Sequence, residues 1–173
     1  MNKLKSNPIQ SKLFWKGKTY KLRYFDLNTF DHLPYEKCQQ VYGVCFCKKR
    51  MVIVKGESEE SGKGWGLVGG HVEKGEKFKE TLRREIKEET NMKLLKSIPI
   101  GAQEVTSPKG KVFYQLRYCA IVKPIGKFEK DPDGSITEIK MINPKNYKKY
   151  FDWGEIGEKI IRRALDLVLA AQR

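Results

Sequence analysis

The segment of residues 69–92 constrains the fold of this chain more than any other. It opens with a glycine-rich turn and continues into a charged stretch with helical periodicity. Phe78, Leu82 and Ile86 recur every four residues, which places them on one apolar face of a helix that begins near Phe78. Asn91 is one of the few residues besides glycine that tolerates the left-handed conformation at a helix C-terminus, so we expect the helix to end there.

Acidic side chains border this apolar face. Glu85 and Glu89 are four residues apart along its edge, and Glu88 is rotated further toward solvent. Like charges at this spacing destabilise a helix by about 0.2–0.5 kcal/mol per pair. A bound divalent cation would remove that repulsion, and Mg²⁺ or Mn²⁺ suits hard carboxylate oxygens. The alternative is that neighbouring basic residues neutralise the acids as ordinary surface pairs.

A longer pattern of spaced residues favours the metal hypothesis. It consists of Gly70, Glu76, Arg84, Glu85, Ile86, Glu88, Glu89 and Met92. This pattern resembles the Nudix box, G-x5-E-x7-R-E-U-x-E-E-x-G-U, in which U is a bulky apolar residue. Asn91 stands where the family has glycine and can adopt the same left-handed turn. The preceding segment 64–70 is also similar to the family, with Val68 where a proline is frequent.

The resemblance implies an α/β fold, the Nudix α/β/α sandwich with a mixed β-sheet between helices. It also implies Mg²⁺-dependent hydrolysis, in which water attacks a phosphorus atom of a diphosphate that is usually linked to a nucleoside. By the roles of the family, Glu85 and Glu89 are the main metal ligands. Glu88 is a further ligand or the base that acts on the attacking water, and the Gly70 carbonyl is an additional ligand.

Three further residues receive roles by the same resemblance. Glu76 and Arg84 are structural members of the box, and Arg84 ties the loop to the helix through charged hydrogen bonds. Glu138 opens a late strand where several Nudix enzymes carry an extra carboxylate or a substrate contact. The resemblance makes Glu138 a candidate for a base or a substrate contact.

The organisation along the chain is that of one domain with an extension. Its 173 residues suit a single domain. We expect an N-terminal extension at 1–37, with a frayed segment at 1–10 and a hairpin at 12–25, followed by the Nudix domain at 38–173. Strands are expected at 41–47, 51–55, 65–68, 94–107 (broken near its proline), 112–123 and 138–142, a polar loop at 56–63, and a second helix at 156–169.

The net charge of +14 favours anionic partners. A phosphate-rich substrate, including RNA, fits this charge, and so does a solvated basic surface in a lysine-rich chain. The basic residues are scattered along the sequence, with no basic run interleaved with aromatics, so we expect no stacking platform for nucleic acid. Dimers are usual in the family, so a homodimer is possible.

Location and redox state follow from what the sequence lacks. It has no apolar run long enough to cross a membrane and no signal peptide at its N-terminus. The four cysteines show no Cys-x-x-Cys spacing, which favours reduced thiols and argues against a zinc site. We expect a cytoplasmic protein.

Three functions remain open at this point. The first is a pyrophosphohydrolase that acts on a small nucleotide, such as a nucleoside triphosphate or a modified one. The second applies the same chemistry to RNA 5′ ends. The third is a non-catalytic module that binds a nucleotide. The three acids at 85, 88 and 89 argue against the third, because a module that needs no metal has no reason to keep repelling charges together.

Overall fold

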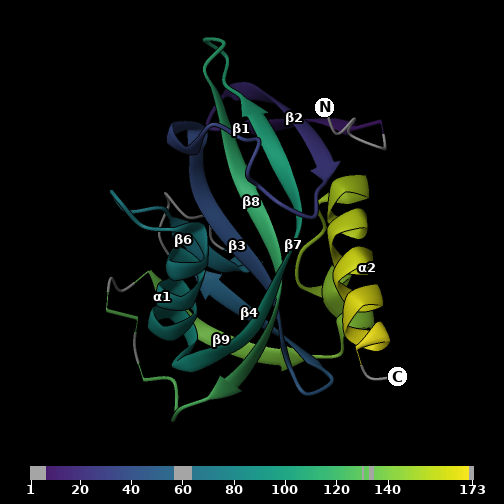
Figure 1. Cartoon of the computed structure of the whole chain (residues 1–173). Coiled ribbons are helices and arrows are strands. Elements are labelled where there is room, and N and C mark those ends of the chain that lie inside the picture. The colour runs from purple at the N-terminus through teal and green to yellow at the C-terminus, as the bar shows by residue number, and fades with distance from the viewer. Residues whose placement is uncertain (1–6, 57–63, 130, 133–134, 172–173) are drawn as a thin grey trace.

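The computed structural model of the chain describes residues 7–56, 64–129, 131–132 and 135–171. Of the expected polar loop at 56–63, all residues after Gly56 lie outside the described residues. So does most of the segment expected to be frayed. The rest of the chain forms one curled sheet with a helix on each side (Figure 1).

Nine strands make up the sheet. They are β1 (Ile9–Trp15), β2 (Lys18–Asp26), β3 (Cys38–Cys47), β4 (Arg50–Gly56), β5 (Gly64–Gly66), β6 (Val68–His71), β7 (Met92–Thr106), β8 (Val112–Pro124) and β9 (Ile136–Ile142). The main path runs β1-β2-β7-β8-β3-β4-β5, while β6 pairs with β3 and β9 pairs with β4. Strands β3 and β8 run parallel and the other described pairs are antiparallel, so the sheet is mixed as expected.

The two helices cover opposite faces of this sheet (Figure 1). Helix α1 (Phe78–Thr90) buries Leu82 and Ile86 in a cluster with Val41 of β3. Helix α2 (Gly154–Ala170) packs into the other cluster, which includes Val44 of β3. Alternating residues of one strand therefore supply both cores, as expected for a sheet buried on its two faces. The predicted α/β/α sandwich is confirmed.

Two short 3₁₀ helices complete the described elements, at Tyr35–Lys37 and Pro144–Lys149. The segment 27–37 does more than link the hairpin to the next strand. Its Phe30 is buried, and the ring lies 6.2 Å from the ring of Phe78 and 5.2 Å from that of Tyr118, measured between centroids. This aromatic contact anchors the start of α1 against the sheet.

The expected N-terminal hairpin is confirmed as β1 and β2, and it is continuous with the main sheet because β2 pairs with β7. The expectation of fraying through residue 10 is wrong at its end, since Ile9 pairs with Tyr24. The expectation that no basic segment is interleaved with aromatics is also wrong here. Strand pairing sets Trp15 opposite Lys18 in a region rich in lysine. The division at residue 37 stays a prediction.

Two other strands differ from the expectation. The segment 65–68 is divided, because β5 pairs with β4 while β6 pairs with β3, so the chain changes partner between them. Strand β7 continues through Pro99 rather than breaking there. Its register against β8 shifts between Pro99 and Gly101, which accommodates a residue that lacks a backbone N–H.

The four cysteines are free thiols, and all but Cys47 are buried. Neither helix of the described chain combines the length and the apolar character that a membrane crossing requires.

Candidate active site

Helix α1 is held at both ends by contacts that its sequence supplies. At its start the backbone N–H of Lys77 donates to the Glu80 carboxylate at 2.9 Å. At its end Asn91 is left-handed, with φ 52° and ψ 42°, which confirms the expected stop. The Asn91 side chain also donates to the carbonyl of Lys127 at 2.8 Å. The helix therefore has a fixed length and phase, which fixes where its acids lie.

Arg84 joins this helix to the preceding loop. Its Nε lies 2.7 Å from Glu76 Oε1 and its Nη2 lies 3.1 Å from Glu76 Oε2, a bidentate pair. The same Nη2 donates to the carbonyl of His71 at 2.9 Å. Thr81 adds a hydroxyl donor to Glu76 at 2.7 Å. These hydrogen bonds, with Arg84 first, lower the pKa of Glu76 to about 2.

The remaining guanidinium nitrogen of Arg84 faces the other acids. Nη1 lies 2.8 Å from Glu85 Oε1 and 3.3 Å from Glu88 Oε2. The Glu88 side chain is 30 % exposed against 12 % for Glu85, so the helical phase expected from the sequence is confirmed. Arg84 thus lies between Glu76 of the loop, which it pairs with through two hydrogen bonds, and the acids of the helix.

Glu89 is the most buried of these acids, with 7 % of its surface exposed. One oxygen accepts the backbone N–H of Gly69 at 3.0 Å. Burial raises the pKa of Glu89 to about 9, and the charge of Glu85 adds to the shift, although the Gly69 N–H opposes it. Burial likewise raises the pKa of Glu85. The helix therefore holds two carboxyl groups in a place that disfavours their charged forms.

Two glycines of β6 let the backbone pass directly over these groups. A Cβ on Gly70 would lie 2.4 Å from Glu85 Oε1, and a Cβ on Gly69 would lie 2.1 Å from the carbonyl oxygen of Val41. Neither distance leaves room for a side chain. The pairing of β6 with β3 holds this backbone in place.

This arrangement fits a hard divalent cation. Gly70 forms a cradle that a Cβ would fill, directly against the carboxylate of Glu85, and Glu89 lies on the same side of α1. Among the described residues, no three acidic, histidine or cysteine side chains are already gathered as a ligand cluster. The acids instead share contacts with Arg84 and with the Gly69 N–H, so binding a cation would replace contacts that exist here.

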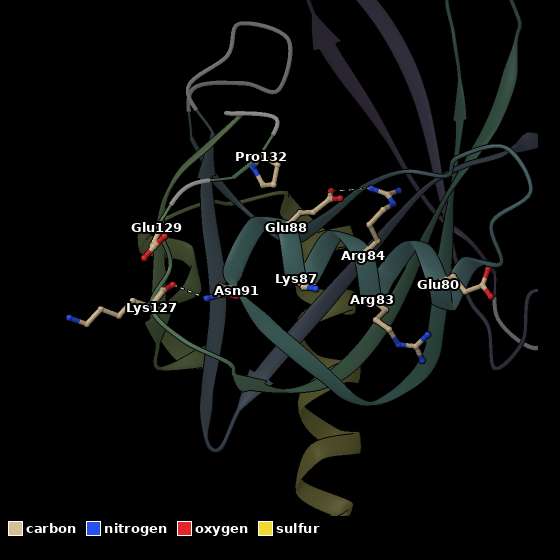
Figure 2. A pocket seen from close by; sticks show the side chains of 9 residues that line it. All are labelled: Glu80, Arg83, Arg84, Lys87, Glu88, Asn91, Lys127, Glu129 and Pro132. Atoms are coloured by element: carbon tan, nitrogen blue, oxygen red, sulfur yellow. Dashed lines mark hydrogen bonds and ion pairs between the residues drawn. The ribbon is translucent and has the colours of Figure 1, made fainter.

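A hollow of about 700 Å³ opens on the outer side of α1 (Figure 2), and of Glu85, Glu88 and Glu89 only Glu88 lines it. It is lined by Glu80, Arg83, Arg84, Lys87, Glu88, Asn91, Lys127, Glu129 and Pro132. Glu88 lies at its wall with its carboxylate directed toward Arg84. The basic side chains on the same wall suit the phosphates of an anionic ligand.

One acid in this region could not be recognised from the sequence pattern. Asp131 is 2 % exposed and its carboxylate accepts hydrogen bonds from Ser135 Oγ at 2.8 Å and from the backbone N–H of Ile136 at 3.1 Å. Its charge also raises the pKa of both Glu85 and Glu89, so it lies close to them. An aspartate in a loop with proline and glycine carries no spacing signal that would have identified it.

Glu138 lies elsewhere in the described structure. On β9 it forms an exposed ion pair with Lys55 of β4, with Nζ and Oε1 3.1 Å apart. None of the contacts described joins it to α1. Its expected role as a base or substrate contact stays a prediction.

The family model for the NUDIX domain matches residues 39–164. This chain belongs to the Nudix family. No curated protein matches it significantly. Among solved structures, the Bacillus subtilis pyrophosphohydrolase BsRppH is similar with a TM-score of 0.63 at 19 % identity, over 94 % of this chain and 97 % of that one.

Two other solved Nudix structures show the same fold. A MutT Nudix hydrolase from Burkholderia pseudomallei has a TM-score of 0.52 at 18 % identity, over 61 % of this chain and 82 % of that one. A Nudix hydrolase from Nitrosomonas europaea has a TM-score of 0.55 at 17 % identity, over 79 % and 92 %. The family match identifies the present protein as a Nudix hydrolase, an enzyme of the class that acts on pyrophosphate bonds.

Proposed function

We propose that this Nudix hydrolase uses Mg²⁺, or Mn²⁺ in its place, to cleave a nucleoside diphosphate-linked substrate such as a nucleoside triphosphate or a modified one. Water attacks at phosphorus. The observation that carries the proposal is the burial of Glu85 and Glu89 against a backbone that only glycine permits. Burial disfavours the charged forms of these two acids, and a bound cation would make the charged forms favourable.

The positions of the residues support the roles that we propose for them. Glu85, Glu89 and the carbonyl of Gly70 would hold the metal, which when bound supplies charge neutralisation and a lowered pKa for water. Glu88 is the more exposed acid at the hollow, so it is placed to accept a proton from the attacking water or to act as a further ligand. Asp131 adds negative charge beside this group.

The hollow carries a basic wall next to Glu88. Arg83, Lys87 and Lys127 line it, and cations there would attract the phosphate oxygens of a substrate. Glu85 and Glu89 lie outside this lining, against the backbone of β6. Arg84 serves a different purpose. Its bidentate contact with Glu76 fixes the loop that carries the Gly70 carbonyl.

The test is phosphate or pyrophosphate release from a panel of nucleoside triphosphates, oxidised forms, dinucleoside polyphosphates and nucleotide sugars, with Mg²⁺ and with EDTA. We expect release that requires Mg²⁺ and that Glu85→Gln and Glu89→Gln abolish. Glu155→Gln is the matched control, because this exposed glutamate lies on α2. Full activity of both box variants would overturn the metal assignment.

A second candidate is hydrolysis at RNA 5′ ends. The observation that favours it is the charge of the N-terminal hairpin, where residues 9–25 hold five basic residues and no acidic one. It predicts faster turnover of a triphosphorylated RNA than of the free nucleotide. Binding of nucleotide without any turnover would instead support the non-catalytic module. A cytoplasmic location and a homodimer stay predictions.

A further inference from the structure

The hairpin formed by β1 and β2 exposes large apolar side chains. Leu13, Phe14 and Trp15 are 46 %, 74 % and 42 % exposed. All residues of β1 after Ile9 are exposed, so the strand is held by its pairing with β2 and contributes little to either core. Three consecutive apolar residues at an exposed edge are unusual for a soluble protein and mark a surface that binds something.

Lysines surround these side chains. Lys12, Lys16, Lys18 and Lys21 are all exposed, and among the described residues none of the four forms an ion pair. Lys12 lies directly opposite Lys21 across the hairpin, an arrangement of like charges that destabilises a strand pair. An anion beside the two lysines would relieve this repulsion.

The rings of Phe14 and Trp15 each lie near lysines of the hairpin. Because side chains alternate along a strand, Phe14 shares a face with Lys12 and Lys21, while Trp15 and Lys18 lie on the other face. Lys16 Nζ lies 4.7 Å from the centre of the Trp15 ring. Aromatic rings flanked by unpaired cations are the combination that binds single-stranded nucleic acid, with bases stacked on rings and phosphates near lysines.

Two other occupants fit less well. A second copy of this chain would bring the same four lysines against their equivalents, and lysine on an edge strand opposes such pairing. A membrane surface favours an element with its apolar side chains on one face. Here the rings of Phe14 and Trp15 lie on opposite faces of the hairpin.

We propose that the β1–β2 hairpin is a binding surface for single-stranded RNA. In this proposal the RNA lies on the hairpin and not at the acids of α1. Phe14 contributes the larger share of the stacking on the bases. Phe14 is the more exposed ring, whereas Trp15 already contacts Tyr20 with ring centroids 6.1 Å apart. The proposal does not require the proposed catalytic function, since a surface of this kind binds RNA whether or not its end is cleaved.

The test measures binding of a fluorescent, unstructured 12-nucleotide RNA with a 5′-hydroxyl, by fluorescence anisotropy at several salt concentrations. This probe has no anhydride to cleave, so its result is independent of catalysis. We expect Phe14→Ala to weaken binding about tenfold, and Trp15→Ala by less. A duplex of the same sequence should bind more weakly, because its bases are not free to stack.

Charge is tested with a matched pair of double variants. Lys12→Gln with Lys21→Gln removes the cross-strand lysines of the hairpin, and Lys93→Gln with Lys123→Gln removes a similar cross-strand pair of β7 and β8. Each phosphate contact to a single strand contributes about 0.7 to the slope of log affinity against log salt concentration. The hairpin variant loses two lysines, so we expect its slope to be shallower by about 1.4. The β7–β8 variant should bind like the parent protein.

Several outcomes would overturn the proposal. They are unchanged binding in Phe14→Ala, an equal loss in the β7–β8 lysine variant, and duplex binding as tight as single-strand binding. Variants that turn a dimer into a monomer in light scattering would assign the hairpin to self-association instead. Loss of binding to phosphatidylserine vesicles in the same variants, with RNA binding kept, would assign it to a membrane. Thermal unfolding of each variant verifies that the fold is intact.

Discussion

Two carboxylates of the same motif show opposite physical behaviour. Glu76 is paired twice with Arg84 and its pKa is lowered to about 2. Glu89 is buried beside other acids, and its pKa is raised to about 9. One end of the motif is therefore stabilised by its charges, whereas the other end is destabilised by them. The difference separates a carboxylate that stabilises the loop from one that we propose binds a cation.

The same distinction appears in how each acid meets its neighbours. The partner of Glu76 is a guanidinium that matches both of its oxygens, which is the strongest common geometry for a carboxylate. The described partner of Glu89 is a single backbone N–H from Gly69. A buried acid with so little compensation lowers stability unless a cation joins it. Sites that bind or catalyse often carry such a local penalty.

The largest expected effect comes from removing the destabilised acids. Glu89→Gln keeps an oxygen that can accept the Gly69 N–H but removes the charge, so we expect turnover with Mg²⁺ to fall by at least about a hundredfold. The free energy of unfolding at pH 8 without metal should stay equal or rise. Steady-state kinetics and urea unfolding on the same preparation measure the two effects. If Glu89→Gln loses stability as well as activity, then the charge of Glu89 stabilises the fold as that of Glu76 does, and the two acids do not differ.

Glu76→Gln should behave in the opposite way. It removes a charged, bidentate partner from Arg84, so we expect the free energy of unfolding to fall by about 2 kcal/mol. Turnover should fall less than in Glu89→Gln, since the proposed metal ligands remain. Urea unfolding at pH 7 measures the change. A loss of stability no larger than that in Glu155→Gln would show that the Arg84 contact is ordinary surface pairing.

The pH dependence sharpens the contrast further. Between the unfolded pKa of a glutamate, about 4.3, and the folded value of about 9 for Glu89, the folded state keeps a proton that the unfolded state has released. Without metal, stability therefore falls as pH rises through this range, by up to about 1.4 kcal/mol per pH unit. The lowered pKa of Glu76 acts in the opposite sense, adding stability that is lost only as pH falls through its folded value.

Thermal unfolding from pH 5 to pH 9 in EDTA tests this expectation, and Glu89→Gln should flatten the profile. Because metal binding requires the charged carboxylate, Mg²⁺ affinity should rise with pH over the same range. Calorimetry in two buffers of different ionisation enthalpy would detect the released protons. A profile that stays steep in Glu89→Gln would assign the titration to another group.

The smallest effect is expected at the end of α1. Asn91→Gly restores the residue usual in the family and relieves the left-handed backbone, but it removes the hydrogen bond to the carbonyl of Lys127. The two changes oppose each other, so we expect the free energy of unfolding to change by less than about 0.5 kcal/mol. A loss beyond about 1 kcal/mol would show that this side chain holds the wall of the hollow.

The local features of the site could be predicted from the sequence because they depend on spacing. Residues three and four apart on a helix lie on one face, which placed Glu85, Glu88 and Glu89 correctly relative to the core. The stop at Asn91 followed from the conformations that its side chain permits. Both predictions use only contacts within a few residues.

The remaining features depend on distant contacts. Asp131 approaches the acids of α1 only because of how the fold places its loop, and no pattern around it shows this. The change of partner between β5 and β6 is equally non-local. The lysines and rings of the hairpin lie near each other in the sequence, but their alternation on two exposed faces becomes clear only when the strands are paired.

The parallel pairing of β3 with β8 has a consequence for synthesis on the ribosome. It joins residues near 40 to residues near 118, and β6, which carries Gly70, is held by β3. A nascent chain can form the β1–β2 hairpin early. The strand pairing that positions Gly69 and Gly70 over Glu89 is complete only after β8 has emerged. Folding of such long-range pairs is slow compared with local structure. The apolar stripe of α1 therefore stays uncovered in the nascent chain until β8, which ends at Pro124, has been synthesised.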